Sequence, residues 1–121
     1  REVLVGCVHM DFRSDAEMAP NGEKLATLLA AEARPVIFGG DINFWPGTRT
    51  LRALESQLSR PRKTGPAATF PADQPRGEID HIFLRPAAAF KVRECRVVPE
   101  AMASDHRPVL LEVELAPEPS K

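Results

Sequence analysis

Apolar residues in this chain form short blocks, some with the spacing of β-strands and others with that of α-helices. Strands are predicted at residues 3–8, 36–38, 79–84, 91–98 and 109–115. The block at 3–8 is continuous and β-branched, which predicts a strand buried on both faces. The last block alternates more clearly, so Glu112 and Glu114 are expected to face water.

Two other segments carry leucines at helical spacing. Asn21 can cap a helix over about residues 22–33, and Thr48 can cap a shorter one. The apolar stripe of the first helix comprises Leu25, Leu28 and Leu29. Residues 12–20 are polar and broken, and residues 59–77 are rich in proline and basic side chains, so both are predicted to be loops.

The order strand, helix, strand, helix and then three strands predicts a mixed α/β layer rather than a doubly wound sheet. The 121 residues are enough for one domain, expected over residues 1–116, with a disordered, proline-rich tail at 117–121. No apolar run approaches the roughly 20 residues that cross a bilayer. The net charge of -1 gives no general attraction to polyanions, so any recognition of phosphate must be local.

Two features outside the strands and helices bear on chemistry. Cys7 and Cys95 are too few for a disulfide framework, and Cys7 is expected to be a reduced core residue. The basic stretch at 60–63 could contact a nucleic-acid backbone or a phospholipid head group, or it could be a solvated loop.

Three acidic motifs follow or adjoin predicted strands. They are residues 40–43 (Gly-Asp-Ile-Asn), 79–81 (Ile-Asp-His) and 104–108 (Ser-Asp-His-Arg-Pro). Strand ends in one rigid sheet commonly deliver the groups that gather round a charged substrate. Carboxylates that bind Mg²⁺, with an imidazole nearby, suit attack of water on a phosphate ester. The three motifs therefore predict one shared anion-binding site.

Each motif can also be interpreted without a catalytic role. Asp41 and Asn43 share one side of the backbone if it stays extended, but both residues also make turns well. Asp105, just before His106, could be a metal ligand or could cap a turn. Asp80 enters an apolar strand and needs a partner, for which His106 is the natural candidate.

Three further side chains have two interpretations. His9 ends the first strand, where a single histidine can be a core residue or can assist at the phosphate. His81 points away from Asp80 and is expected to be structural. Trp45 could stack on a base or line the substrate pocket, or it could cover the adjoining helix.

In this order the motifs resemble the signature of the endonuclease/exonuclease/phosphatase superfamily, which has the deoxyribonuclease-I-like fold. His9 and the strand before it resemble that family's histidine strand, and residues 69–71 (Thr-Phe-Pro) are similar to a segment that many bacterial members carry before the same aspartate. The resemblance extends from residue 3 to about 115. It implies an α/β sandwich in which a mixed β-sheet carries helices on one face.

The resemblance also implies a metal-dependent phosphodiester hydrolase that uses Mg²⁺ or Mn²⁺. Asp41 would orient the attacking water and help hold the metal, and Asn43 would contact the phosphate. Asp105 would be a metal ligand, and Trp45 would meet the substrate.

The remaining implied roles belong to the histidines and Asp80. Asp80 would pair with His106, whose imidazole would contact the scissile phosphate. His9 would assist at the phosphate or the leaving group. His81 departs from the family, in which tyrosine often follows this aspartate.

Domains of this superfamily usually have about twice this length, and their first half supplies an asparagine and a metal-binding glutamate. Since the chain opens on Arg1 and is at once in a strand, we expect it to be the carboxy-terminal half, with the amino-terminal half as its partner. Two alternatives stay open, a non-catalytic module that binds phosphate ligands and an inactive truncated fragment. Nucleic acid, phospholipid head groups and small phosphodiesters are all possible substrates.

Overall fold

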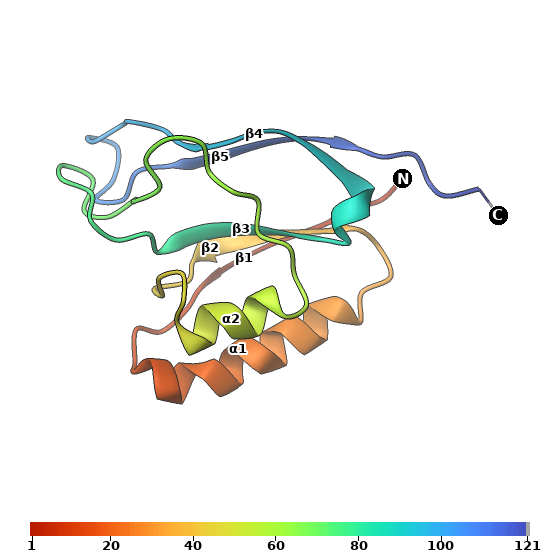
Figure 1. Ribbon diagram of the computed structural model, residues 1–121, viewed down its shortest axis with the longest axis horizontal. Coiled ribbons are helices and arrows are strands. Elements are labelled where there is room, and N and C mark those ends of the chain that lie inside the picture. The colour runs from red at the N-terminus through yellow and green to blue at the C-terminus, as the bar shows by residue number, and fades with distance from the viewer. Residues whose placement is uncertain (121) are drawn as a thin grey trace.

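Two β-sheets lie face to face in a computed structural model that describes residues 1–120, and both helices cover the outer face of one sheet (Figure 1). The strands are β1 (Leu4–His9), β2 (Val36–Asp41), β3 (Asp80–Arg85), β4 (Phe90–Val97) and β5 (Val109–Leu115). The helices are α1 (Asp15–Ala30), α2 (Arg49–Glu55) and a short 3₁₀ turn, η1 (Ala87–Ala89). The mixed sheet with helices on one face confirms the predicted fold class.

The first sheet has the strand order β1-β2-β3, and the second is the hairpin β4-β5. β1 and β2 are parallel because α1 carries the chain back across the sheet, whereas β3 runs antiparallel to β2. The carboxyl ends of β1 and β2 and the amino end of β3 therefore lie at one rim of the sheet.

The hydrophobic core fills the space between the first sheet and the helices. Val36, Phe38 and Phe83 point from the sheet toward the helices and are at most 4% exposed. A smaller cluster around Leu84 and Phe90 joins the two sheets. This packing fixes β2 and β3 from both sides, so the rim on which they end is rigid.

Helix α1 begins about two turns earlier than predicted, because the cap is Ser14 rather than Asn21. The Ser14 hydroxyl accepts a hydrogen bond from the Glu17 amide at 3.2 Å. Pro20 lies inside the helix and has no N–H to donate to the Ala16 carbonyl. Because Ala16 and Pro20 are both exposed, water can hydrogen-bond to that carbonyl instead. In this helix Leu28 lies on the solvent side and is 70% exposed, whereas it was expected on the apolar stripe with Leu25 and Leu29.

The prediction that β1 is buried on both faces is wrong. Its residues alternate between half-buried and exposed, so Val5 is 71% exposed, and Cys7 is exposed rather than in the core. The reason is that hairpin β4-β5 covers the sheet over β3 but does not extend over β1. By contrast, Glu112 and Glu114 of β5 face solvent, as predicted.

The two glycines before Asp41, Gly39 and Gly40, continue β2 in register with its neighbours. Gly40 has a φ of +143°, and a Cβ there would lie 2.0 Å from the Val8 carbonyl oxygen. The glycine thus lets β1 approach β2 closely where both strands end.

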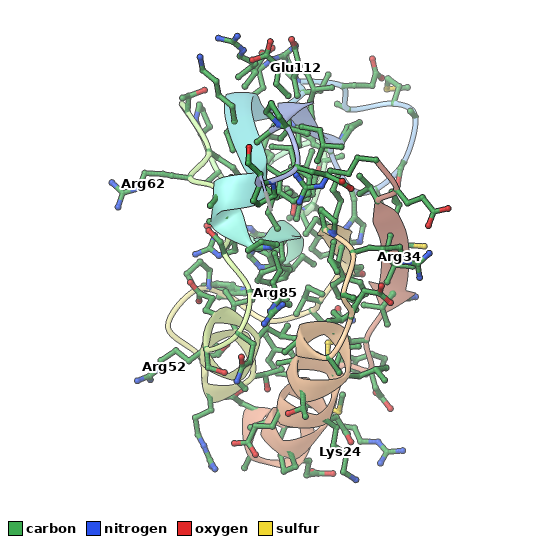
Figure 2. The ribbon with its side chains drawn as sticks, turned by 90° about the vertical axis from the view of Figure 1, so that its right-hand side faces the viewer. Lys24, Arg34, Arg52, Arg62, Arg85 and Glu112 are labelled. Atoms are coloured by element: carbon green, nitrogen blue, oxygen red, sulfur yellow. The ribbon has the colours of Figure 1, made fainter. Side chains whose placement is uncertain are left out.

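The basic stretch at 60–63 is neither a free patch nor a wholly solvated loop. Arg62 projects from the surface (Figure 2), but the Lys63 side chain is only 3% exposed. Its ammonium group donates to Glu78 Oε2 at 2.9 Å and to the Asp80 carbonyl at 2.8 Å. Arg60 also pairs with Glu78, at 3.3 Å. These ion pairs and hydrogen bonds therefore hold the start of β3 in place.

The tail at 117–121 stays a predicted disordered segment, and Lys121 lies outside the described residues. No helix among residues 1–120 is long and apolar enough to span a lipid bilayer.

Candidate functional site

Three of the predicted site residues form a single row at the rim of the first sheet. His9 ends β1, Asp41 ends β2 and Asp80 begins β3, and strand pairing places Asp41 between the other two. Residues paired in this way project to the same face of a sheet. The acidic motifs that lie far apart in the sequence therefore meet because the strands that carry them are neighbours.

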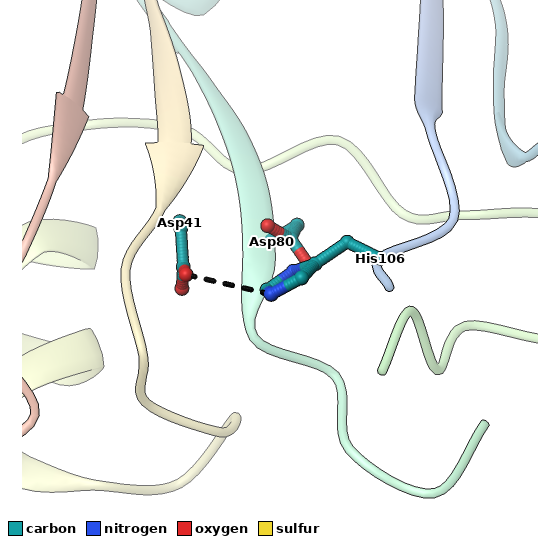
Figure 3. Close-up of side chains that lie close together, drawn as sticks. All are labelled: Asp41, Asp80 and His106. Carbon is teal, nitrogen blue, oxygen red and sulfur yellow. Dashed lines mark hydrogen bonds and ion pairs between the residues drawn. The ribbon is translucent and has the colours of Figure 1, made fainter. Parts of the chain in front are cut away.

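His106 completes the site from the loop that leads into β5, and its ring points toward Asp80 and Asp41 (Figure 3). Its Nδ1 donates to Asp80 Oδ2 at 2.8 Å, and its Nε2 lies 3.7 Å from Asp41 Oδ2. His9 approaches Asp41 from the other side, with Nε2 at 3.4 Å from the same oxygen. The structure thus brings the two carboxylates and His106 together, as the sequence predicted.

The electrostatics of the cluster reflect two acids in close proximity. Burial raises the pKa of Asp41, and the charge of Asp80 raises it further, against the opposing effects of His106, the Asn43 amide and His9. Burial lowers the pKa of His106, but the hydrogen bond that its imidazole donates to Asp80 and the charges of the neighbouring carboxylates outweigh this effect, so the pKa is raised overall. The site therefore favours bound positive charge.

Asn43 does not have the extended conformation that would place its side chain beside that of Asp41. Its φ of +66° is left-handed, and its backbone amide donates to Asp41 Oδ1 at 3.0 Å, forming a tight turn. The side-chain amide of Asn43 donates to the Met10 carbonyl. Asp41 and Asn43 therefore do not project side by side, and the turn instead orients the Asp41 carboxylate and ties β2 to the end of β1.

The structure does not bring every predicted residue into the cluster. Asp105 is exposed, and its carboxylate is not among the mutually close ligand atoms of residues 1–120, which come from Asp41, Asp80 and His106. Trp45 is 55% exposed and packs beside Gly77 at the rim. His81 is fully buried and its Nε2 donates to the Phe44 carbonyl at 2.8 Å, which agrees with a structural role.

The sequence analysis missed the residues that support the cluster from the long loop before β3. The Phe70 ring lies against the His106 imidazole, with ring centroids 4.8 Å apart. Thr69 is fully buried and contacts Asp80. The only signal for them was the family-like segment at 69–71, which says nothing about what these side chains touch.

A groove of about 500 Å³ runs from the cluster along the inner face of the first sheet. Its apolar wall includes Cys7, Ile37, Ile82 and Val109, and its polar end is the acidic cluster with His106. The exposed side of β1 forms one border of this groove. An anionic ligand with an apolar extension would fit such a lining.

The donor set suits a hard divalent cation. One ligand atom from each of Asp41, Asp80 and His106 lies within 4.8 Å of the others. Mg²⁺ and Mn²⁺ prefer carboxylate oxygens, and a cation would offset the burial and the neighbouring Asp80 charge that raise the pKa of Asp41. The residues present therefore fit the metal that the motifs imply.

Fold and site together define a class: an α/β sandwich with acids and an imidazole at the rim of a mixed sheet. A sequence profile of the Endonuclease/Exonuclease/phosphatase family matches residues 4–106, and the chain belongs to that family. No curated protein matches the chain by sequence.

Solved structures share the fold. A conserved protein of unknown function from Enterococcus faecalis is 21% identical with a TM-score of 0.76, covering 91% of this chain and 49% of that one. A mannosyl-6-phosphatase from Bacteroides thetaiotaomicron is 23% identical with a TM-score of 0.71, and the match covers 90% of this chain and 50% of that one. The human Nocturnin catalytic domain is 20% identical with a TM-score of 0.72, and the match covers 91% of this chain and 46% of that one. This chain spans about half the length of these structures.

Proposed function

We propose that this chain provides one half of a Mg²⁺- or Mn²⁺-dependent phosphoric ester hydrolase, in which water attacks phosphorus in line. The observation that carries the proposal is the row of His9, Asp41 and Asp80 closed by His106. Family membership supports the same reaction class. The cluster collects acceptors for a water and donors for a phosphate within one rigid rim, which is the arrangement that such chemistry needs.

Each side chain of the cluster has a distinct role in this proposal. Asp41, held by the Asn43 amide, accepts a proton from the attacking water and orients it. His106 presents Nε2 to the phosphate, since Nδ1 is engaged with Asp80. His9, with its side chain 77% exposed, is free to assist at the phosphate or the leaving group.

The proposal also assigns the metal and substrate contacts. Asp41 would help hold the Mg²⁺ or Mn²⁺ ion, which when bound neutralises charge on the phosphate. Asp105 stays a predicted further ligand, and Asn43 and Trp45 stay predicted substrate contacts. Trp45 lies exposed at the rim, where it can meet the group attached to phosphorus.

We further propose that the remainder of a full-length family domain packs against the open groove and the exposed side of β1. The support is that relatives of the same fold are about twice as long, while Val5 and Cys7 lie on an uncovered inner face. Activity is therefore expected of the longer protein, and the isolated chain is expected to be slow or inactive.

The test is hydrolysis of bis-p-nitrophenyl phosphate with Mg²⁺ or Mn²⁺, by this chain and by a version extended at its amino end. We expect metal-stimulated turnover in the extended protein that is lost in Asp41→Ala and His106→Ala. Glu112→Ala, which removes an exposed carboxylate from β5, is the matched control and should keep full activity. Tight phosphate binding without turnover would instead indicate a non-catalytic module and would contradict the proposal.

A further inference from the structure

Thr69 makes an unusual contact for a residue of a proline-rich loop. Its side chain is fully buried, and its hydroxyl lies 2.5 Å from Asp80 Oδ2. The same carboxylate oxygen accepts the hydrogen bond from His106 Nδ1 at 2.8 Å. One oxygen atom of Asp80 is therefore held between the threonine and the imidazole.

The hydroxyl has a second acceptor within reach, because Gly77 O lies 3.4 Å from Thr69 Oγ1. A hydroxyl has only one proton to donate. The carboxylate oxygen is both nearer and charged, and hydrogen bonds to charged acceptors are the stronger ones. The proton therefore goes to Asp80.

The backbone around Thr69 is tied to the loop that carries His106. The Arg107 amide donates to the Thr69 carbonyl at 2.7 Å, and the Ala72 amide donates to the Asp105 carbonyl at 2.7 Å. The Thr69 amide in turn donates to Gly77 O at 2.9 Å. Thr69 thus lies at the junction between the amino end of β3 and the segment on both sides of His106.

We propose that Thr69 is a positioning residue that fixes the Asp80 carboxylate, and through it the orientation of the His106 imidazole. With Asp80 Oδ2 held by the hydroxyl, the carboxylate cannot rotate away from Nδ1, and Nε2 stays directed toward Asp41 and the phosphate. The inference rests on the proposed function and adds to it a residue that touches neither substrate nor metal.

The first test compares Thr69→Val, which keeps the shape and removes the hydroxyl, with Thr69→Ser, which restores a hydroxyl. In the extended protein we expect Thr69→Val to lower kcat about tenfold with KM little changed, the order expected for one hydrogen bond to a charged group. Thr69→Ser should recover most of the rate. Thr69→Cys, whose thiol is a weak donor, should lie between them.

Thr50 provides a matched control. It is also fully buried, and its hydroxyl donates to a carboxylate, Asp15 Oδ1, at 2.7 Å, but it lies where α2 meets α1. Thr50→Val should therefore destabilise the fold about as much as Thr69→Val while leaving kcat unchanged. Equal loss of kcat in both variants would show that only stability matters and would overturn the inference.

A second measurement does not depend on turnover. In this chain labelled with ¹⁵N-histidine, the proton on His106 Nδ1 should give a slowly exchanging resonance in the parent, Thr69→Ser and Thr50→Val proteins. In Thr69→Val its exchange with water should be at least about tenfold faster, because the acceptor is no longer held. An unchanged resonance would refute the positioning role, whereas an inactive parent enzyme with the expected resonances would refute only the proposed function.

Discussion

Asp80→Asn is the substitution that most sharply probes the pairing on which the site depends. Asp80 is a carboxylate with its side chain 18% exposed, and it accepts from both Thr69 and His106 through one oxygen. The amide keeps the shape but carries no charge. A hydrogen bond to a charged group contributes about 1.5–3 kcal/mol, and each 1.4 kcal/mol is a factor of ten. We therefore expect kcat/KM to fall by roughly tenfold to a hundredfold.

The pH dependence of stability provides an independent check on the same variant. The folded-state pKa of His106 is raised above its ordinary value of 6.5. The pairing therefore stabilises the fold fully below pH 6.5, and this stabilisation is lost as the pH rises through the folded-state pKa. In Asp80→Asn the free energy of unfolding should fall less steeply as the pH rises above 6.5, which urea unfolding at a series of pH values would measure. A variant with parental kcat/KM and an unchanged pH profile would refute the pairing.

Three further predictions concern the residues that hold the rim in place. Gly40→Ala should prevent folding or lower the free energy of unfolding by more than about 3 kcal/mol, because its Cβ would lie 2.0 Å from the Val8 carbonyl oxygen; a urea midpoint near the parental one would contradict this. Lys63→Met should destabilise the fold by about 1.5–3 kcal/mol, because Glu78 keeps only Arg60 as a partner and the Asp80 carbonyl loses its donor, and a loss below about 1 kcal/mol would show that the Lys63 contacts are dispensable. Burial lowers the pKa of His81 to about 4, so its neutral form contributes stability above pH 6.5 that is lost as the pH falls toward 4. In His81→Gln that acid-side slope should shrink, whereas a slope equal to that of the parent would assign it to other groups.

The strands and the meeting of the acidic motifs could be predicted from the sequence because both follow from local rules. Continuous apolar blocks identified β2 and β3, and the aspartates where one block ends and the next begins were enough to place Asp41 and Asp80 at one site. The interaction of Asp80 with His106 followed from the cost of burying an unpaired carboxylate.

What could not be predicted depends on contacts between distant segments. Nothing local shows that Cys7 faces an uncovered groove, because this depends on how far hairpin β4-β5 extends. Pro20 indicates a break unless it is known that the Ala16 carbonyl faces water. Thr69 is one polar residue in a proline-rich loop, and its role appears only when β3 and the loop bearing His106 are placed beside it.

Binding of Mn²⁺ followed by NMR tests most directly whether Asp41, Asp80 and His106 surround one metal site. Substoichiometric Mn²⁺ should broaden the backbone amide resonances of Asp41, Asp80 and His106 first and leave those of α1 sharp. Broadening that begins at the exposed acids of α1, or that spreads evenly over the chain, would contradict a shared site at the rim of the sheet.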